Sequence, residues 1–189
     1  MSKNVFTWEQ NFKDIILELV PEFKKCVGFK QNNPHHIYDV WKHTLHALES
    51  TDESYDSITK LAILFHDIKK PECYREDKDG IGHFYGHSYA GADYVNNLFR
   101  FMCLSDSITI QVCQLIRYHE IQFEDSDEFV YKWIDRIGDL QFRRLLDLKV
   151  ADVAAQNPLY RSNKYKILES LINRQNRIRE EQDKLITIK

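Results

Sequence analysis

The stretch LAILFHDIKKP, residues 61–71, places an imidazole and a carboxylate side by side directly after a mostly apolar segment. The apolar spacing predicts a helix that carries His66 and Asp67 at its C-terminal end and is stopped by Pro71. An ionised Asp67 buried there would cost several kcal/mol without a compensating cation or metal ion. The neighbouring imidazole can supply a second ligand to the same ion. A helix-end histidine beside a capping aspartate explains the pair equally well.

Four further polar residues occur in comparably apolar settings. His43 in DVWKHTLHAL is expected to face inward, where a satisfied core histidine is the alternative to a metal ligand. Asp152 in KVADVAAQ lies on a helix otherwise rich in Leu, Val and Ala, and a carboxylate there needs a partner. His87 and His119 are expected at a helix start and a helix end, where a purely structural role is possible for each. A shared metal ion explains all of them together.

Helical periodicity extends over most of the chain, and glycine and proline are rare, at six and four residues. We therefore expect an all-α fold with a single domain over residues 1–189. Residues 72–86, which contain DKDG, form the longest expected irregular stretch and are the expected rim of an active site. The other expected helices lie within 6–29 and over 33–49, from Ser54 or Asp56 to 68, and over 87–101, 106–118, 128–137, 140–155 and 164–184.

Composition favours an ordinary globular protein. Apolar residues make up 43% and charged residues 29% of the 189 positions. The formal net charge of -3 gives no overall field for a polyanion, so tight duplex nucleic-acid binding is not expected. An anionic substrate remains compatible, because a buried divalent cation dominates its local field.

The cysteines and the N-terminal segment bear on the compartment. Cys26, Cys73, Cys103 and Cys113 form no CxxC pair and are expected to be reduced core thiols. MSKNVFTWEQNFKD lacks the apolar region of a signal peptide, and no run approaches 18 apolar residues. We therefore expect a cytoplasmic protein without a membrane segment. The oligomeric state does not follow from these features.

These residues resemble the HD-domain superfamily of metal-dependent phosphohydrolases over residues 34–158. HHIYDVWKHTLHAL, LFHDIKKPE, GHFYGHSYAGA, LIRYHE and KVADVAAQNP look especially like the HD domain of many bacterial tRNA nucleotidyltransferases. Without a nucleotidyltransferase segment, the HD module alone is expected. The family commonly has Gly where Lys69 stands, whereas Lys70 keeps the matching Lys. The resemblance implies one metal site at His43, His66, Asp67 and Asp152, and a second ion held through Asp67 by His87 and His119.

The resemblance implies one or two divalent transition-metal ions, and the mixed nitrogen and oxygen ligands suit Fe, Mn, Ni, Co or Zn. Such ions activate water and clamp phosphoryl oxygens, with Asp67 as the bridging carboxylate. Lys70 is expected to reach a phosphate oxygen, although a surface lysine is an equal alternative. His36, near a helix start, is a candidate to bind a second phosphate or a ribose.

The implied activity is hydrolysis of a phosphomonoester or cyclic phosphodiester on a nucleotide or an RNA end. HD relatives also act on dinucleoside polyphosphates, guanosine tetraphosphate or deoxynucleotides, so a small-nucleotide hydrolase is the enzymatic alternative. A helical module that retains metal without catalysis, or that binds a tRNA-like partner, is an alternative of a different class. A protein with no metal would leave several inward polar residues without a shared partner.

Overall fold

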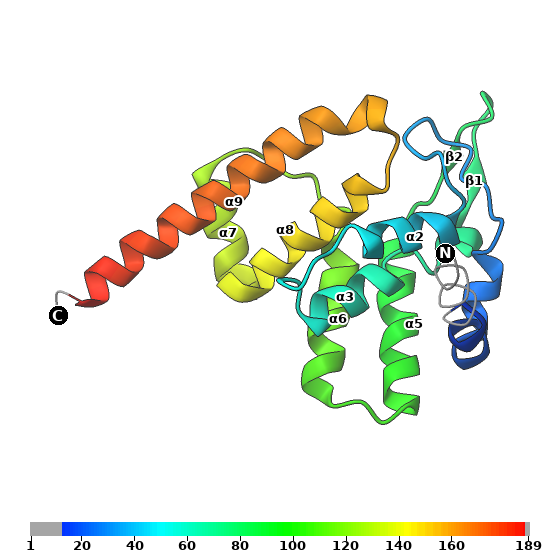
Figure 1. Ribbon diagram of the computed structural model, residues 1–189, viewed down its shortest axis with the longest axis horizontal. Helices are drawn as coiled ribbons and strands as arrows, with labels where there is room; N and C mark the ends of the chain where they lie inside the picture. Colours follow the sequence, from blue (N-terminus) through cyan, green and yellow to red (C-terminus); the bar gives the residue numbers. More distant parts are fainter. Residues whose placement is uncertain (1–12, 188–189) are drawn as a thin grey trace, which may run out of the picture.

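The computed structural model describes residues 13–187, with side chains described to residue 184, and its fold is all-α apart from one short hairpin (Figure 1). Residues 13–19 are helical and are followed by the 3-10 helix η1 (Pro21–Lys25). The remaining helices are α2 (Val40–Glu49), α3 (Ser57–Phe65), α4 (Lys70–Cys73), α5 (His87–Phe101), α6 (Asp106–Tyr118), α7 (Asp127–Ile137), α8 (Asp139–Ala154) and α9 (Pro158–Thr187).

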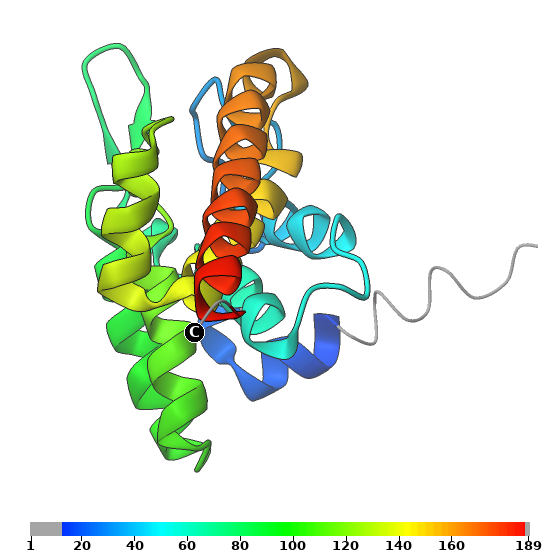
Figure 2. The same cartoon turned by 90° about the vertical axis from the view of Figure 1, so that its left-hand side faces the viewer.

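Helices α3 and α8 lie at the centre of the bundle. Helix α3 packs against α2, α6 and α8, and α8 also contacts α7 and α9. Helices α5 and α6 form an antiparallel pair on one side, while α9 runs along the other side and extends past the bundle (Figures 1 and 2). Helix α8 buries several large apolar side chains completely, with Phe142, Leu145 and Leu146 at 0% exposure. Each such side chain contributes roughly 1.5–3 kcal/mol of transfer free energy.

Capping side chains mark the starts of α2 and α3. The expected helix at 33–49 begins only at Val40, because the Asp39 side chain accepts a hydrogen bond from Lys42 N at 2.8 Å. The prediction that this helix starts at the Asn33–Pro34 pair, at residue 33, is wrong. Helix α3 likewise starts after Asp56, whose side chain accepts from Thr59 N at 2.9 Å.

The prediction that the third helix runs through the His66–Asp67 pair and stops at Pro71 is also wrong. Helix α3 ends at Phe65, a turn follows, and Pro71 lies in the first turn of α4. A proline is tolerated there because its missing N–H would have no partner within the helix. The chain therefore bends between Asp67 and Lys70.

The irregular stretch 72–86 contains a small antiparallel hairpin of β1 (Arg75–Glu76) and β2 (Gly82–His83). Gly82 allows it to approach the loop before α2, since a Cβ atom at this position would lie 2.2 Å from the backbone oxygen of Gln31. The hairpin is thus held against residues that precede the first metal-ligand candidate.

Other expectations shift by smaller amounts. Helix α9 begins at Pro158 instead of residue 164, and the start of the segment 6–29 lies outside the described residues. All four cysteines are free, but Cys26 is buried and Cys103 is exposed, so the expectation of core thiols is wrong for Cys103. Among the described residues, we find no helix long and apolar enough to cross a membrane.

Candidate metal centre

The six predicted metal-ligand residues lie together in the centre of the bundle. Their side chains come from α2, the end of α3 and the turn after it, the start of α5, the end of α6, and α8. None exceeds 5% exposure, and the individual values are 0% for His43, 1% for His66, 1% for Asp67, 0% for His87, 2% for His119 and 5% for Asp152. Buried polar groups on this scale require partners.

Backbone carbonyl groups orient the four imidazoles in the same way. The Nδ1 atoms face carbonyl oxygens, at 2.7 Å from Ile63 O in His66, 2.8 Å from Phe84 O in His87, 2.7 Å from Ile116 O in His119 and 3.4 Å from Ala155 O in His43. A carbonyl oxygen only accepts, so each Nδ1 carries the hydrogen. In the neutral ring the Nε2 atom then carries no hydrogen and has a free lone pair, which is the arrangement that metal-binding histidines use.

Helix ends supply two of these carbonyl groups. His66 and His119 are the C-cap residues of α3 and α6, where the last carbonyls have no amide partner within the helix. Each imidazole uses the free carbonyl three residues before it. The sequence position at a helix end thus fixes both the location and the tautomer of the ring.

The unprotonated nitrogens converge on the Asp67 carboxylate from two sides. On one side, Asp67 Oδ2 lies 3.1 Å from His66 Nε2 and 3.6 Å from His43 Nε2. On the other side, Asp67 Oδ1 lies 3.1 Å from His87 Nε2 and 3.7 Å from His119 Nε2. Ligands that share an ion with bonds near 2.1 Å lie about 3.0–3.4 Å apart. Both groups could therefore hold a metal ion, with Asp67 common to the two.

Two unsatisfied atoms show that the residues present fit a metal ion. His66 Nε2 and Asp67 Oδ2 are buried and have no hydrogen bond of acceptable geometry. Lys70 Nζ lies 2.7 Å from Asp67 Oδ2 and compensates the negative charge of the carboxylate, but the angles of this ion pair do not fit a hydrogen bond. A divalent cation accepts lone pairs from both atoms and removes the cost of leaving them unpaired.

Asp152 differs from the other five residues, because its carboxylate already has several partners. Oδ1 lies 3.1 Å from His43 Nε2 and accepts a hydrogen bond from Gln156 Nε2 at 3.1 Å, while Oδ2 pairs with Lys149 Nζ at 2.7 Å. It lies outside both groups of mutually close ligand atoms. Its position next to His43 agrees with the expected ligand set, and the role of Asp152 as a ligand stays a prediction.

The electrostatics favour charged carboxylates at Asp67 and Asp152 and a neutral imidazole at His119. Burial opposes protonation of His66, but the charge of Asp67 raises its pKa. Burial opposes ionisation of Asp67, but His66 and Lys70 hold the pKa of its carboxyl well below the usual range. Burial likewise opposes ionisation of Asp152, and Lys149 holds its pKa well below the usual range. Burial lowers the pKa of His119 to about 4, so this ring stays neutral near pH 7. A carboxylate binds a metal ion in its charged form, and an imidazole binds one in its neutral form.

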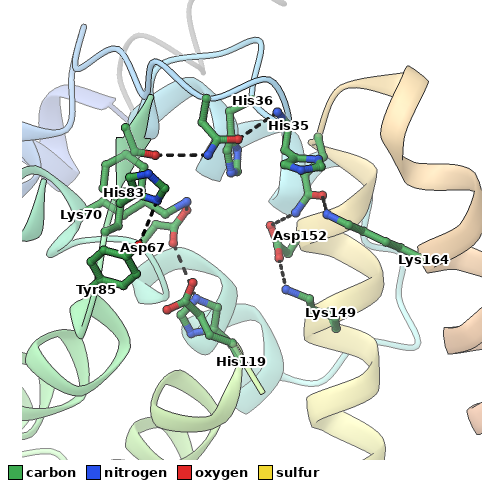
Figure 3. Close-up of a pocket in the computed structure, with 15 residues that line it drawn as sticks. His35, His36, Asp67, Lys70, His83, Tyr85, His119, Lys149, Asp152 and Lys164 are labelled. Atoms are coloured by element: carbon green, nitrogen blue, oxygen red, sulfur yellow. Dashed lines mark hydrogen bonds and ion pairs between the residues drawn. The ribbon is translucent and has the colours of Figure 1, made fainter. Parts of the chain in front are cut away.

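A cavity of about 300 Å³ opens beside these residues, and Asp67, His119 and Asp152 reach its surface (Figure 3). Both predicted substrate-binding residues line it. Lys70 is 5% exposed, and its Nζ donates to Gln31 Oε1 at 2.9 Å, so the surface-lysine alternative is wrong. His36 also lines the cavity, and burial lowers its pKa to about 2.

Several residues at or beside the cavity were not identified from the sequence. Lys149 lies one turn before Asp152, and this i, i+3 spacing could have identified it. Lys164 comes from α9, and Gln31, which accepts a hydrogen bond from Lys70, comes from the loop before α2. No sequence spacing links either residue to the metal-ligand candidates. Among the other lining residues, Gly82, His83, Phe84 and Tyr85 belong to the stretch 72–86 that was expected to form the rim, and His35 directly precedes His36. The lining residues that were not predicted are Asn33, Glu120 and Gln156.

Comparisons with known proteins agree with this geometry. An A-adding tRNA nucleotidyltransferase from Deinococcus radiodurans is 29% identical over 144 residues, which cover 74% of this chain and 33% of the relative. A CC-adding tRNA nucleotidyltransferase from Thermus thermophilus is 28% identical over 130 residues, covering 64% of this chain and 29% of the relative. A bifunctional uridylyltransferase/uridylyl-removing enzyme from Azospirillum brasilense is 29% identical over 194 residues, covering 87% of this chain and 20% of the relative.

The chain spans between a fifth and a third of the length of these relatives. The HD domain family matches residues 35–156, which is more than half of the chain. This range contains all six metal-ligand candidates and ends two residues before α9. The chain therefore belongs to the HD domain family.

Proposed function

We propose that this chain is a metal-dependent phosphohydrolase acting on a phosphomonoester or a cyclic phosphodiester of a nucleotide or an RNA end. HD domains form a superfamily of metal-dependent phosphohydrolases. The observation that carries the proposal is the cavity in which the candidate metal ligands Asp67 and His119 lie beside the ammonium group of Lys70. Relatives named for tRNA nucleotidyltransfer and for uridylyl removal support a nucleotide or RNA-end substrate.

In this proposal, one or two divalent ions are held by His43, His66, Asp67 and Asp152, and by His87 and His119. Metal ions in such sites lower the pKa of water and polarise phosphoryl oxygens. The backbone carbonyls keep each Nε2 lone pair directed at the centre, so no tautomer change is needed for binding. Asp67 contributes the negative charge that both groups share.

Lys70 positions the phosphoryl group in this proposal. Gln31 fixes its ammonium group at the cavity wall, 2.9 Å from the amide oxygen. From there it can donate to a phosphoryl oxygen and stabilise the charge that develops as the ester bond breaks. His36 lies on the same cavity and is proposed to contact the nucleoside portion or a second phosphate.

The proposal is tested by hydrolysis assays on 2′,3′-cyclic nucleotides, nucleoside 2′-phosphates, dinucleoside polyphosphates and guanosine tetraphosphate, with Mn, Fe, Ni, Co or Zn added singly. We expect turnover that depends on the metal and is abolished by Asp67→Asn, which removes the shared charge at nearly constant volume. Asp135→Asn on the exposed face of α7 is the matched control and keeps full activity. Absence of turnover on every substrate with every metal would refute the enzymatic function.

Two alternatives are separated by the same assays. Preferential turnover of dinucleoside polyphosphates or guanosine tetraphosphate would identify a small-nucleotide hydrolase. Tight metal binding without hydrolysis, with protein groups completing the coordination, would identify a metal-stabilised binding module.

A further inference from the structure

The three lysines that line the cavity differ in their partners. Lys70 Nζ pairs with Asp67 and Lys149 Nζ pairs with Asp152, each at 2.7 Å. Lys164 Nζ instead donates to the neutral side-chain oxygen of Gln156, at 2.6 Å, and forms no ion pair with any residue that the structure describes. One positive charge on the cavity wall therefore has no carboxylate partner of its own.

Lys164 is also partly removed from water. Its side chain is half-buried, and burial together with the neighbouring charge of Lys149 lowers the pKa of its ammonium group. A desolvated ammonium group without a counter-ion is stabilised by any anion that enters the cavity. The nearest carboxylate of this wall, Asp152, is already paired with Lys149 and hydrogen-bonded to Gln156.

The position of Lys164 separates it from the phosphoryl-binding wall. It extends from α9 and meets Gln156, close to Lys149 of α8, whereas Lys70 lies on the opposite wall beside Asp67 (Figure 3). An anion held by Lys164 would thus be distinct from one held between Lys70 and the metal-ligand candidates. The family match ends at residue 156, so nothing in it assigns Lys164 a role.

We propose that Lys164, with Lys149 beside it, forms a subsite for a second phosphate group of the substrate, so that nucleotides with two separate phosphates are preferred over monophosphates. This inference rests on the proposed phosphohydrolase function and specifies its substrate class. Gln156 acts as a positioning residue, because it links the ammonium group of Lys164 to Asp152. The scissile phosphate then lies on the metal side and the second phosphate on the α9 side.

The first experiment measures binding without turnover. Adenosine 3′,5′-bisphosphate, adenosine 3′-monophosphate and adenosine 5′-monophosphate are titrated into the chelator-treated chain by calorimetry. We expect the bisphosphate to bind about 10- to 100-fold more tightly than either monophosphate, as for one charge-assisted interaction. In Lys164→Gln this ratio should fall to about 1, while Lys164→Arg should retain most of it.

Lys166→Gln is the matched control, because it removes the same charge from an exposed position of α9 outside the cavity. It should leave the ratio unchanged. Thermal melting of each variant establishes that the fold is retained. A bisphosphate preference absent from the unaltered chain, or equal in Lys164→Gln, would overturn the proposal.

The second experiment measures kcat and KM of the metal-loaded chain on the bisphosphate and the monophosphates. Lys164→Gln should raise KM for the bisphosphate about 10-fold or more and leave the monophosphate values within about 2-fold. An equal loss on all substrates would assign Lys164 a general structural role and overturn the subsite. If no compound is hydrolysed but the binding ratio depends on Lys164, the proposed function fails and the second-phosphate subsite stands.

Discussion

His87 Nε2 and His119 Nε2 face each other at 3.2 Å, although both rings have committed their Nδ1 hydrogens to backbone carbonyls. Two neutral rings in this tautomer present lone pairs to each other, so the contact is not a hydrogen bond between neutral groups. Asp67 Oδ1 adds a third electron-rich atom to the same space. A cation bound between the three atoms would replace the repulsion between their lone pairs by coordination.

Replacing His119 by Ala should remove one metal ion and leave the other. The ring contacts Asp67 on the side opposite His43 and His66, so the ligand group of His43, His66 and Asp67 remains complete. Metal analysis of the purified variant is expected to give about one equivalent less than the unaltered chain. His46→Ala, which removes an exposed imidazole paired with Glu49, is the control. An unchanged metal content in His119→Ala would exclude the second site.

Removal of metal should destabilise the fold. The candidate ligands come from helices that are distant in sequence, so a bound ion links them in the folded state alone. At metal concentrations 100- to 1,000-fold above Kd, we expect about 3–4 kcal/mol of added stability by urea unfolding, which a chelator abolishes. Asp67→Asn should show little response to either treatment. Equal unfolding curves with and without metal would contradict the prediction.

Lys70 and Lys69 provide a matched pair for testing the phosphoryl contact. Lys70 lines the cavity, whereas Lys69 Nζ pairs with Glu22 at 2.6 Å and with Glu72 at 2.8 Å away from it. Lys70→Met should lower kcat about 100-fold, the size expected for the loss of one preorganised donor. Lys69→Met should alter stability more than turnover. Similar kcat values in the two variants would show that Lys70 does not contact the reacting group.

His36 should make the stability of the metal-free chain depend on pH. Burial, and then the charge of Lys70, lowers its pKa to about 2, whereas an unfolded histidine titrates near 6.5. The unfolded state therefore binds more protons between these values, and stability falls as the pH decreases below about 6.5. From pH 7 to pH 5 this one group should cost about 2 kcal/mol.

Urea unfolding in the presence of a chelator checks this dependence. His36→Phe should lose about 1–2 kcal/mol less than the unaltered chain between pH 7 and pH 5. An identical pH dependence for His36→Phe and the unaltered chain would show that folding does not lower the pKa of His36.

The sequence allowed the all-α fold and the residues of the buried cluster to be predicted, because polar groups at the ends of apolar helices are costly without partners. Helices α5 and α6 have the expected bounds, 87–101 and 106–118. The turn between Asp67 and Lys70 was not predicted, since a proline can end one helix or begin the next. Lys164 and Gln31 were missed because tertiary packing alone brings α9 to the cavity and the loop before α2 to Lys70.

The close approach of Gly82 to the backbone of Gln31 fixes the position of the hairpin independently of the helices that carry the metal-ligand candidates. Gly82→Ala would force a Cβ atom against backbone, so we expect the hairpin to move and the KM to rise while the metal content is maintained. Metal analysis and steady-state kinetics on this variant would check the separation. Loss of metal would show that hairpin and metal centre are coupled.

Gly82, His83, Phe84 and Tyr85 form part of the cavity wall, yet none belongs to the candidate metal ligands. The helices therefore carry the part of the site that every substrate would share, and the hairpin carries a part that can vary independently. Exchange of this short loop is a route by which the same buried centre could acquire a different substrate without repacking the bundle.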